Sequence, residues 1–174
     1  MLINELKLSK ELIRRPSVTP KDAGAINLLA KNLRLLGFKC QIMNFKNIKN
    51  LYAKLGKSSP NFCYAGHTDV VPVENYDKWE FEPFSAELKD GKILGRGSSD
   101  CKGLLASQMM AMAILAKNGI KFQDNFTLIS GADEEHGGRY GFGWLLDNHP
   151  EELRFEYAIN EGGGSPVTIG NNLY

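Results

Sequence analysis

The sequence has too little of several features to belong to some common classes of protein. Its three cysteines, Cys40, Cys63 and Cys101, are odd in number and widely spaced, which excludes a disulfide framework and a paired-cysteine zinc ribbon. No apolar run is long enough to span a bilayer. The N-terminal stretch lacks the apolar segment and cleavage site of a signal peptide. These absences favour a reducing cytoplasm as the location.

The chain also lacks an excess of charge of either sign. Lysine and arginine total 21 and aspartate and glutamate total 20, for a net charge of +1. Nucleic acids and anionic membrane surfaces require a basic face, so we expect neither as a partner. The length of 174 residues suffices for one domain with a sizeable core.

Hydrophobic periodicity predicts alternating helices and strands. The N-terminus is an amphipathic helix, and a second helix is expected between a cap at Thr19, with Pro20 in its first turn, and a stop at Gly37. Residues 103–119 are apolar nearly all round, which predicts a buried helix that ends at a Gly119 cap. This order predicts an α/β three-layer sandwich, with a mostly parallel mixed sheet flanked by helices. Strands are expected at Lys39–Phe45, Leu51–Leu55, Phe62–Ala65, Phe126–Ser130 and Tyr157–Ile159.

Acidic side chains follow several of the predicted strands, at the point where each strand ends. In open α/β sheets, sites form in the crevice beyond the carboxyl ends of the strands. Imidazole and carboxylate groups are ligands that zinc accepts, so convergence of these segments predicts a metal site. The candidate residues are His67, Asp69, Asp100, Glu134, Glu135 and Glu161.

Elementary chemistry limits what some of these residues can do. Asp69 lies two residues after His67, so the two share a face if the strand continues, and the carboxylate can orient the imidazole. Glu134 and Glu135 are adjacent and cannot easily both bind one metal ion, so we expect one ligand and one general base. Taken singly, each residue has an ordinary structural explanation. Their joint pattern favours a site.

A ligand count shows what the pattern lacks. Two zinc ions about 3.5–4 Å apart form a common hydrolytic centre, with roughly eight coordination positions in all. A bridging carboxylate and a bridging hydroxide fill half of them, which leaves two histidines and two terminal carboxylates. Asp100 can bridge, Glu135 and Glu161 can be terminal, and His67 is one histidine. The two remaining histidines are expected to face solvent, so one ligand is missing.

Four segments resemble the M20 family of zinc metallopeptidases and deacylases, in order and in spacing. They are AGHTDVVP, GRGSSDCKG, ADEEHGG and NEGGG, and the similarity runs over essentially the whole chain. The opening LIRRPSVTPKDAG is most similar to the desuccinylase members. DEEHGGRYGFGWLL is more similar to the carboxypeptidase and aminoacylase members. The resemblance implies a catalytic domain of the zinc-aminopeptidase type and a role in amino-acid metabolism.

The resemblance also implies roles for the candidate residues. It implies two zinc ions, with cobalt or manganese as alternatives, and a cis peptide bond after Asp100. The general base would take a proton from zinc-activated water and deliver it to the leaving nitrogen of an amide. The implied roles are His67 as ligand of one zinc, Asp69 as its supporting acid, Asp100 as bridge, Glu134 as general base, Glu135 as ligand of the other zinc, and Glu161 as the remaining carboxylate ligand.

Two departures from the family pattern are visible. Members are usually much longer, with a lid or dimerisation domain and a returning catalytic segment that carries the last histidine. We therefore expect residues 1–174 to be the N-terminal part of a catalytic domain, with both later parts absent and a strand still under way over 166–174. Cys101 stands where methionine is common, and a thiol there is open to oxidation or to binding stray metal.

Three functions stay open on these grounds. The first is metal-dependent hydrolysis of an amide bond in a small-molecule N-acyl or peptidyl amino acid, desuccinylase-like, with a homodimer as the full-length form. The second is a peptidase of the carboxypeptidase or aminoacylase type. The third is an inactive truncated metal-binding fragment, or one half of a split enzyme that is active only after mixing with a separate chain.

Overall fold

A mixed five-stranded sheet forms the centre of the molecule. The computed structural model describes residues 3–57, 60–119, 125–161, 168–170 and 172–173. The strand order is β1-β2-β6-β3-β7, with antiparallel pairing for β1–β2 and β2–β6 and parallel pairing for β6–β3 and β3–β7. Two of the four strand pairs are antiparallel, so the sheet is less parallel than the sequence predicts. All five expected strands are present, as β1 Lys39–Phe45, β2 Ile48–Leu55, β3 Asn61–His67, β6 Asn125–Gly131 and β7 Tyr157–Ile159.

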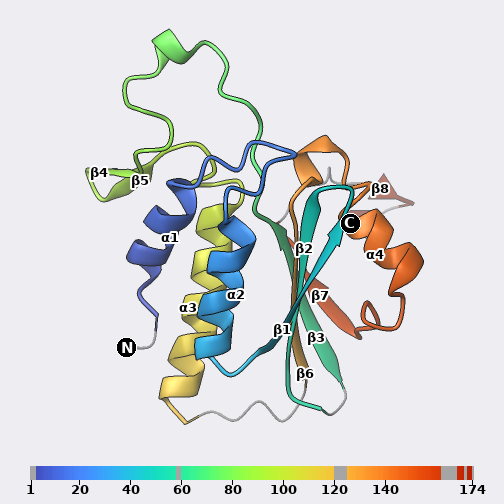
Figure 1. The fold of residues 1–174 in the computed structure, drawn as a ribbon. Coiled ribbons are helices and arrows are strands. Elements are labelled where there is room, and N and C mark those ends of the chain that lie inside the picture. The colour runs from blue at the N-terminus through green and yellow to red at the C-terminus, as the bar shows by residue number, and fades with distance from the viewer. Residues whose placement is uncertain (1–2, 58–59, 120–124, 162–167, 171, 174) are drawn as a thin grey trace.

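Helices cover both faces of this sheet. Three of them, α1 Glu5–Ile13, α2 Ala25–Leu35 and α3 Lys102–Lys117, lie on one face, and α4 Phe142–Asn148 lies on the other (Figure 1). The expected three-layer α/β sandwich is therefore confirmed. Among the described residues, no helix has the length and apolar character needed to cross a membrane. The smaller elements are η1 Tyr76–Lys78, β4 Glu87–Lys89, β5 Lys92–Leu94, η2 Glu134–His136, β8 Thr168–Ile169 and β9 Asn172–Leu173.

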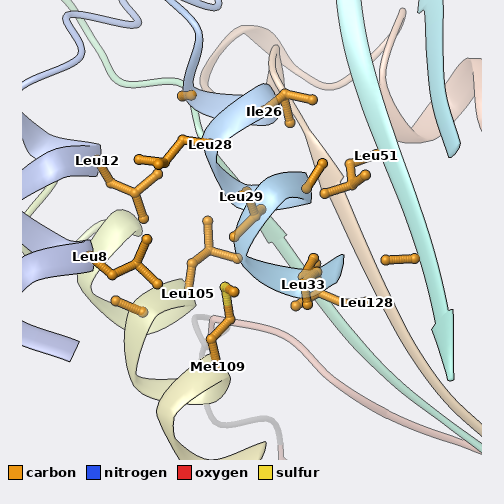
Figure 2. Close-up of a cluster of buried hydrophobic side chains, with 14 of the residues drawn as sticks. Leu8, Leu12, Ile26, Leu28, Leu29, Leu33, Leu51, Leu105, Met109 and Leu128 are labelled. Carbon is orange, nitrogen blue, oxygen red and sulfur yellow. The ribbon is translucent and has the colours of Figure 1, made fainter. Parts of the chain in front are cut away.

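The main core lies between the three helices and the sheet. Figure 2 shows leucines of α1 and α2 that meet α3 side chains and the sheet. A smaller cluster, formed by Met43, Cys63, Ile129 and Leu145, lies under α4. The side chains labelled in Figure 2 are all buried, and they are Leu8, Leu12, Ile26, Leu28, Leu29, Leu33, Leu51, Leu105, Met109 and Leu128.

Replacing Leu29 by alanine tests the importance of this core. Leu29 is 0% exposed, so the change leaves a cavity, and we expect the free energy of unfolding to fall by about 2–5 kcal/mol. Leu35 on the same helix is 53% exposed, and Leu35→Ala should change it by at most about 0.5 kcal/mol. Urea unfolding of both variants measures the difference. Equal losses would contradict the assignment of Leu29 to the core.

The start of α2 differs from the sequence prediction. The helix begins at Ala25, not beside Thr19. The carboxylate of Asp22 accepts hydrogen bonds from the backbone N–H groups of Gly24, at 3.0 Å, and Ile26, at 2.9 Å. Aspartate near a helix start satisfies N–H groups that have no partner within the helix. The prediction of Thr19 as the cap was therefore wrong, because Gly24 is the N-cap residue and the side chain that accepts the hydrogen bonds is that of Asp22.

The helix α3 is less buried than its composition predicts. Leu104 is 38% exposed and Ile114 is 51% exposed. The helix packs against the sheet and α1 with one side, and no described segment covers these two residues. Composition reports how apolar a helix is, whereas burial depends on what packs against each side.

The end of the chain also differs from the expectation. The strands β8 and β9 pair antiparallel, with Thr168 opposite Leu173. Gly170 between them has a positive φ of 63°, which glycine adopts without steric cost. The stretch is therefore a short hairpin instead of one continuing strand, while residues 166, 167, 171 and 174 lie outside the described part.

Candidate metal centre

The sheet topology brings the candidate residues to one edge. His67 ends β3 and pairs with Gly131, which ends β6. Glu134 follows β6, and Glu161 follows β7 by two residues. Asp100 lies two residues before α3, which begins at the same end of the sheet (Figure 1). Because parallel strands end at a common edge, segments far apart in the sequence meet there.

Carboxylates surround one nitrogen of the buried His67 ring. Its Nε2 atom lies 2.9 Å from Asp100 Oδ1, 3.6 Å from Glu134 Oε2 and 3.8 Å from Glu161 Oε1. The side chain of His67 is 1% exposed. Ligand atoms of His67, Glu134 and Glu161 lie within 4.8 Å of one another, as do those of His67, Asp100 and Cys101. The structure thus brings together His67, Asp100, Glu134 and Glu161.

Asp69 supports this arrangement from inside the protein. Its main-chain oxygen lies 3.0 Å from His67 Nδ1, and its carboxylate oxygen Oδ1 lies 3.4 Å from the same nitrogen. The same carboxylate accepts hydrogen bonds from the backbone N–H groups of Glu134, at 3.2 Å, and Glu135, at 3.1 Å. A single buried residue therefore orients the imidazole, through its main-chain oxygen and its carboxylate, and fixes the Glu134–Glu135 segment. The sequence gives no local signal of this second contact.

The Cys101 side chain contacts the backbone of His67. The His67 N–H donates to the Cys101 sulfur at 3.1 Å, and the thiol donates to the His67 carbonyl at 3.0 Å. The Asp100–Cys101 peptide bond is cis, as the family resemblance implied. Burial raises the pKa of the Cys101 thiol, so the uncharged thiol is the favoured form.

The electrostatics of the cluster favour an added positive charge. Burial lowers the pKa of the His67 ring, but hydrogen bonds to Asp69 and Cys101 outweigh it and raise the pKa to about 12. Burial raises the pKa of Glu134, the His67 ring lowers it, and Glu161 raises it again. Carboxylates this close repel one another, so a cation among them removes an unfavourable interaction.

The residues present fit a divalent metal ion. The Glu161 Oε2 atom is buried and has no hydrogen-bond partner in the described part of the chain. A buried oxygen of this kind is costly unless a donor or cation meets it. Imidazole and carboxylate are ligands of zinc and of similar metals. A metal ion would satisfy the orphan oxygen and take the place of the proton on His67.

Glu135 and the other two histidines lie outside the group of close ligand atoms. Burial raises the pKa of Glu135, and the charge of Asp100 raises it further. Its assignment to a second zinc stays a prediction. His136 is exposed, and the His149 ring packs against Trp144 with centroids 5.1 Å apart. Of the three histidines in the sequence, His67 alone joins the cluster that the structure describes.

Sequence reasoning did not single out the buried Lys102. It is 0% exposed, and its Nζ atom donates to the Arg15 carbonyl at 2.7 Å. Burial lowers the pKa of Lys102 to about 8, although the charge of Asp69 opposes this shift. Lys102 thus links the turn after α1 to the start of α3.

Comparisons with known proteins show the family and the fold of this chain. The model of peptidase family M20/M25/M40 matches residues 63–172. A succinyl-diaminopimelate desuccinylase of Ehrlichia canis is 43% identical over 181 residues, covering 99% of this chain and 47% of that protein. A Pelagibacter ubique protein of the same name is 45% identical over 137 residues, covering 76% of this chain and 36% of that protein. The chain therefore spans less than half the length of these two relatives.

Solved structures show the same fold. An M20 family metallo-carboxypeptidase from Sulfolobus solfataricus superposes with a TM-score of 0.84 and 26% identity, covering 93% of this chain and 38% of that one. Human carnosine dipeptidase 1 gives a TM-score of 0.74 at 22% identity, covering 90% of this chain and 38% of that one, which is a likeness of fold. On the family match and these relatives, the chain belongs to peptidase family M20/M25/M40.

Proposed function

We propose that this chain contributes the metal centre of a zinc-dependent hydrolase that cleaves an amide bond in an N-acyl or peptidyl amino acid. The observation that carries the proposal is the buried His67 ring, whose Nε2 atom faces carboxylate oxygens of Asp100, Glu134 and Glu161 within 4 Å. Such a set of ligands with an additional carboxylate nearby suits metal-assisted hydrolysis.

Each residue has a definite part in the proposed mechanism. His67, Asp100, Glu135 and Glu161 would hold the zinc ions. Bound zinc supplies the Lewis acidity that activates water and polarises an amide carbonyl at neutral pH. Glu134 accepts the proton of the attacking water and passes it to the leaving nitrogen. The raised pKa of Glu134 suits a group that must both accept and release a proton.

N-succinyl amino acids are the first substrate class to consider. The two relatives from Ehrlichia canis and Pelagibacter ubique both carry the name succinyl-diaminopimelate desuccinylase. A peptidase of the carboxypeptidase type is the second candidate, because the Sulfolobus solfataricus structure is a metallo-carboxypeptidase at 26% identity. The two classes share the chemistry of amide hydrolysis and differ in the acyl group.

The domain organisation, the partners and the location of the full-length protein are also part of the proposal. We infer that residues 1–174 are the N-terminal part of a catalytic domain, which a lid or dimerisation domain and a later catalytic segment would complete. We also infer a homodimer as the full-length form, a cytoplasmic location, and no nucleic-acid or membrane partner. An inactive metal-binding fragment and one half of a split enzyme are the alternatives for the chain by itself.

Zinc reconstitution with an activity assay tests the proposal. The purified chain is reconstituted with zinc, its metal content is measured by mass spectrometry, and turnover is followed with an N-succinyl and an N-acetyl amino acid. We expect at least one zinc ion per chain, bound at His67, and loss of that ion in His67→Ala. Two ions with turnover would mean that the chain is an enzyme by itself. Bound zinc without turnover would assign activity to a larger unit, and no bound zinc would overturn the proposal.

A further inference from the structure

A hollow lies near the candidate metal centre, because Asp133 and His136, which flank Glu134 and Glu135 in the sequence, are among the residues that line it. It has a volume of about 420 Å³, and Lys46, His136, Arg139 and Tyr140 are among the residues that line it. His136 directly follows the Glu134–Glu135 pair, and Lys46 lies in the turn between β1 and β2. A volume of this size accommodates a small organic molecule.

Two cations, Lys46 and Arg139, border this hollow. Lys46 Nζ lies 5.0 Å from the centre of the Tyr140 ring, and Arg139 Cζ lies 5.8 Å from it. No ion pair of either residue occurs among the described residues. Contact with an aromatic ring orients a cation and leaves its charge in place. A second hollow of about 340 Å³ is lined by the same two cations and Tyr140, and also by the acidic Asp147.

The acidic residue in the lining of the 420 Å³ hollow is the buried Asp133. Asp133 is 4% exposed, and its Oδ2 atom accepts a hydrogen bond from the Tyr140 N–H at 2.8 Å. Burial raises the pKa of Asp133, while hydrogen bonds from the backbone of Tyr140 and Gly141 lower it. Asp133 therefore fixes the loop that carries Arg139 and Tyr140. The exposed charged side chains that border the hollow, Lys46 and Arg139, are both positive.

We propose that Lys46, Arg139 and His136 form a subsite for a carboxylate group of a small molecule. The guanidinium of Arg139 matches a carboxylate in geometry, and Lys46 adds a point charge beside it. The Tyr140 ring supplies an apolar surface for the carbon chain of the ligand. The neighbouring metal centre is rich in carboxylates, so an anionic ligand that approaches it requires positive groups of this kind nearby. Binding does not depend on hydrolysis, whereas the role as a substrate subsite rests on the proposed function.

Calorimetric titration of the metal-free chain with succinate tests the subsite. Succinate should bind, and its neutral analogue succinamide should not. The double variant Lys46→Gln/Arg139→Gln should bind succinate at least about tenfold more weakly, because two charged partners of the carboxylate are lost. Lys89→Gln/Lys92→Gln removes two exposed lysines from the β4–β5 hairpin. This matched control should bind succinate like the unchanged chain.

The outcomes separate this proposal from the proposed function. Glu134→Gln should retain succinate binding, since Glu134 does not line the hollow. Succinate binding that depends on Lys46 and Arg139, in a chain that hydrolyses nothing, would keep the subsite and count against the function. Absence of succinate binding, equal binding of succinamide, or equal affinities in the two double variants would overturn the subsite. Thermal unfolding confirms that each variant is folded.

Discussion

Glu134→Gln is expected to lower kcat for an N-succinyl amino acid by about 10²–10⁴-fold, because the amide cannot accept the proton of the attacking water. Zinc content should not change, because the proposed ligands remain. The unchanged zinc content distinguishes a general base from a metal ligand. The Oε2 atom of Glu134 lies 3.6 Å from His67 Nε2, close enough for a ligand as well as for a base. Measurement of kcat together with zinc content therefore separates the two roles.

The adjacent Glu135→Gln variant is the matched comparison. Glu135 is proposed as a ligand, so this variant should lose part of its zinc as well as its activity. Glu87→Gln, in the exposed strand β4, serves as the control and should change neither. Loss of zinc in Glu134→Gln, with zinc retained in Glu135→Gln, would reverse the assigned roles of the two residues.

Asp69→Asn should weaken zinc binding by about 10–100-fold, the usual effect of removing a group that supports a metal ligand. The carboxylate of Asp69 faces His67 Nδ1 and accepts hydrogen bonds from the N–H groups of Glu134 and Glu135. An asparagine side chain has a single acceptor oxygen, so it can replace only part of these contacts. It also lacks the negative charge that favours a cation at His67. Competition with a chromogenic chelator measures the zinc affinity.

Asp77→Asn provides the control for this prediction. Asp77 is an exposed acid in η1, so its replacement should leave the zinc affinity unchanged. Circular dichroism shows whether Asp69→Asn keeps its fold, since a buried site is changed. An affinity equal to that of the control would mean that Asp69 does not support the metal centre.

Much of the fold follows from local patterns in the sequence. The alternation of apolar residues predicts β1 and β7 with the bounds that the structure has. The helix stop at Gly119 agrees with its positive φ of 71°. The start of α2 is harder to predict from the sequence, because the side chains of Thr19 and Asp22 can both accept hydrogen bonds at a helix start. Only the folded backbone places the Asp22 carboxylate on the free N–H groups.

The residues of the candidate site can be predicted from the sequence in part, but some of their contacts cannot. His67, Asp100 and Glu161 are found from the sequence because each lies at a strand end or a glycine-rich turn, where an α/β sheet forms its crevice. The contacts of Cys101 with the His67 backbone are not predictable in this way. They depend on how the turn before α3 packs against the end of β3, and residue type alone does not predict that packing.

The sequence by itself therefore determined the elements, the ligand types and the family resemblance, because hydrophobic period and strand-end chemistry are local properties. The tertiary structure decided which groups meet. It set the strand order that places β6 beside β3, joined Asp69 to Glu134 and Glu135, and placed Lys46 beside Tyr140 in one hollow. These contacts join residues far apart in the chain, and only the packing of the complete sheet fixes the distances between them.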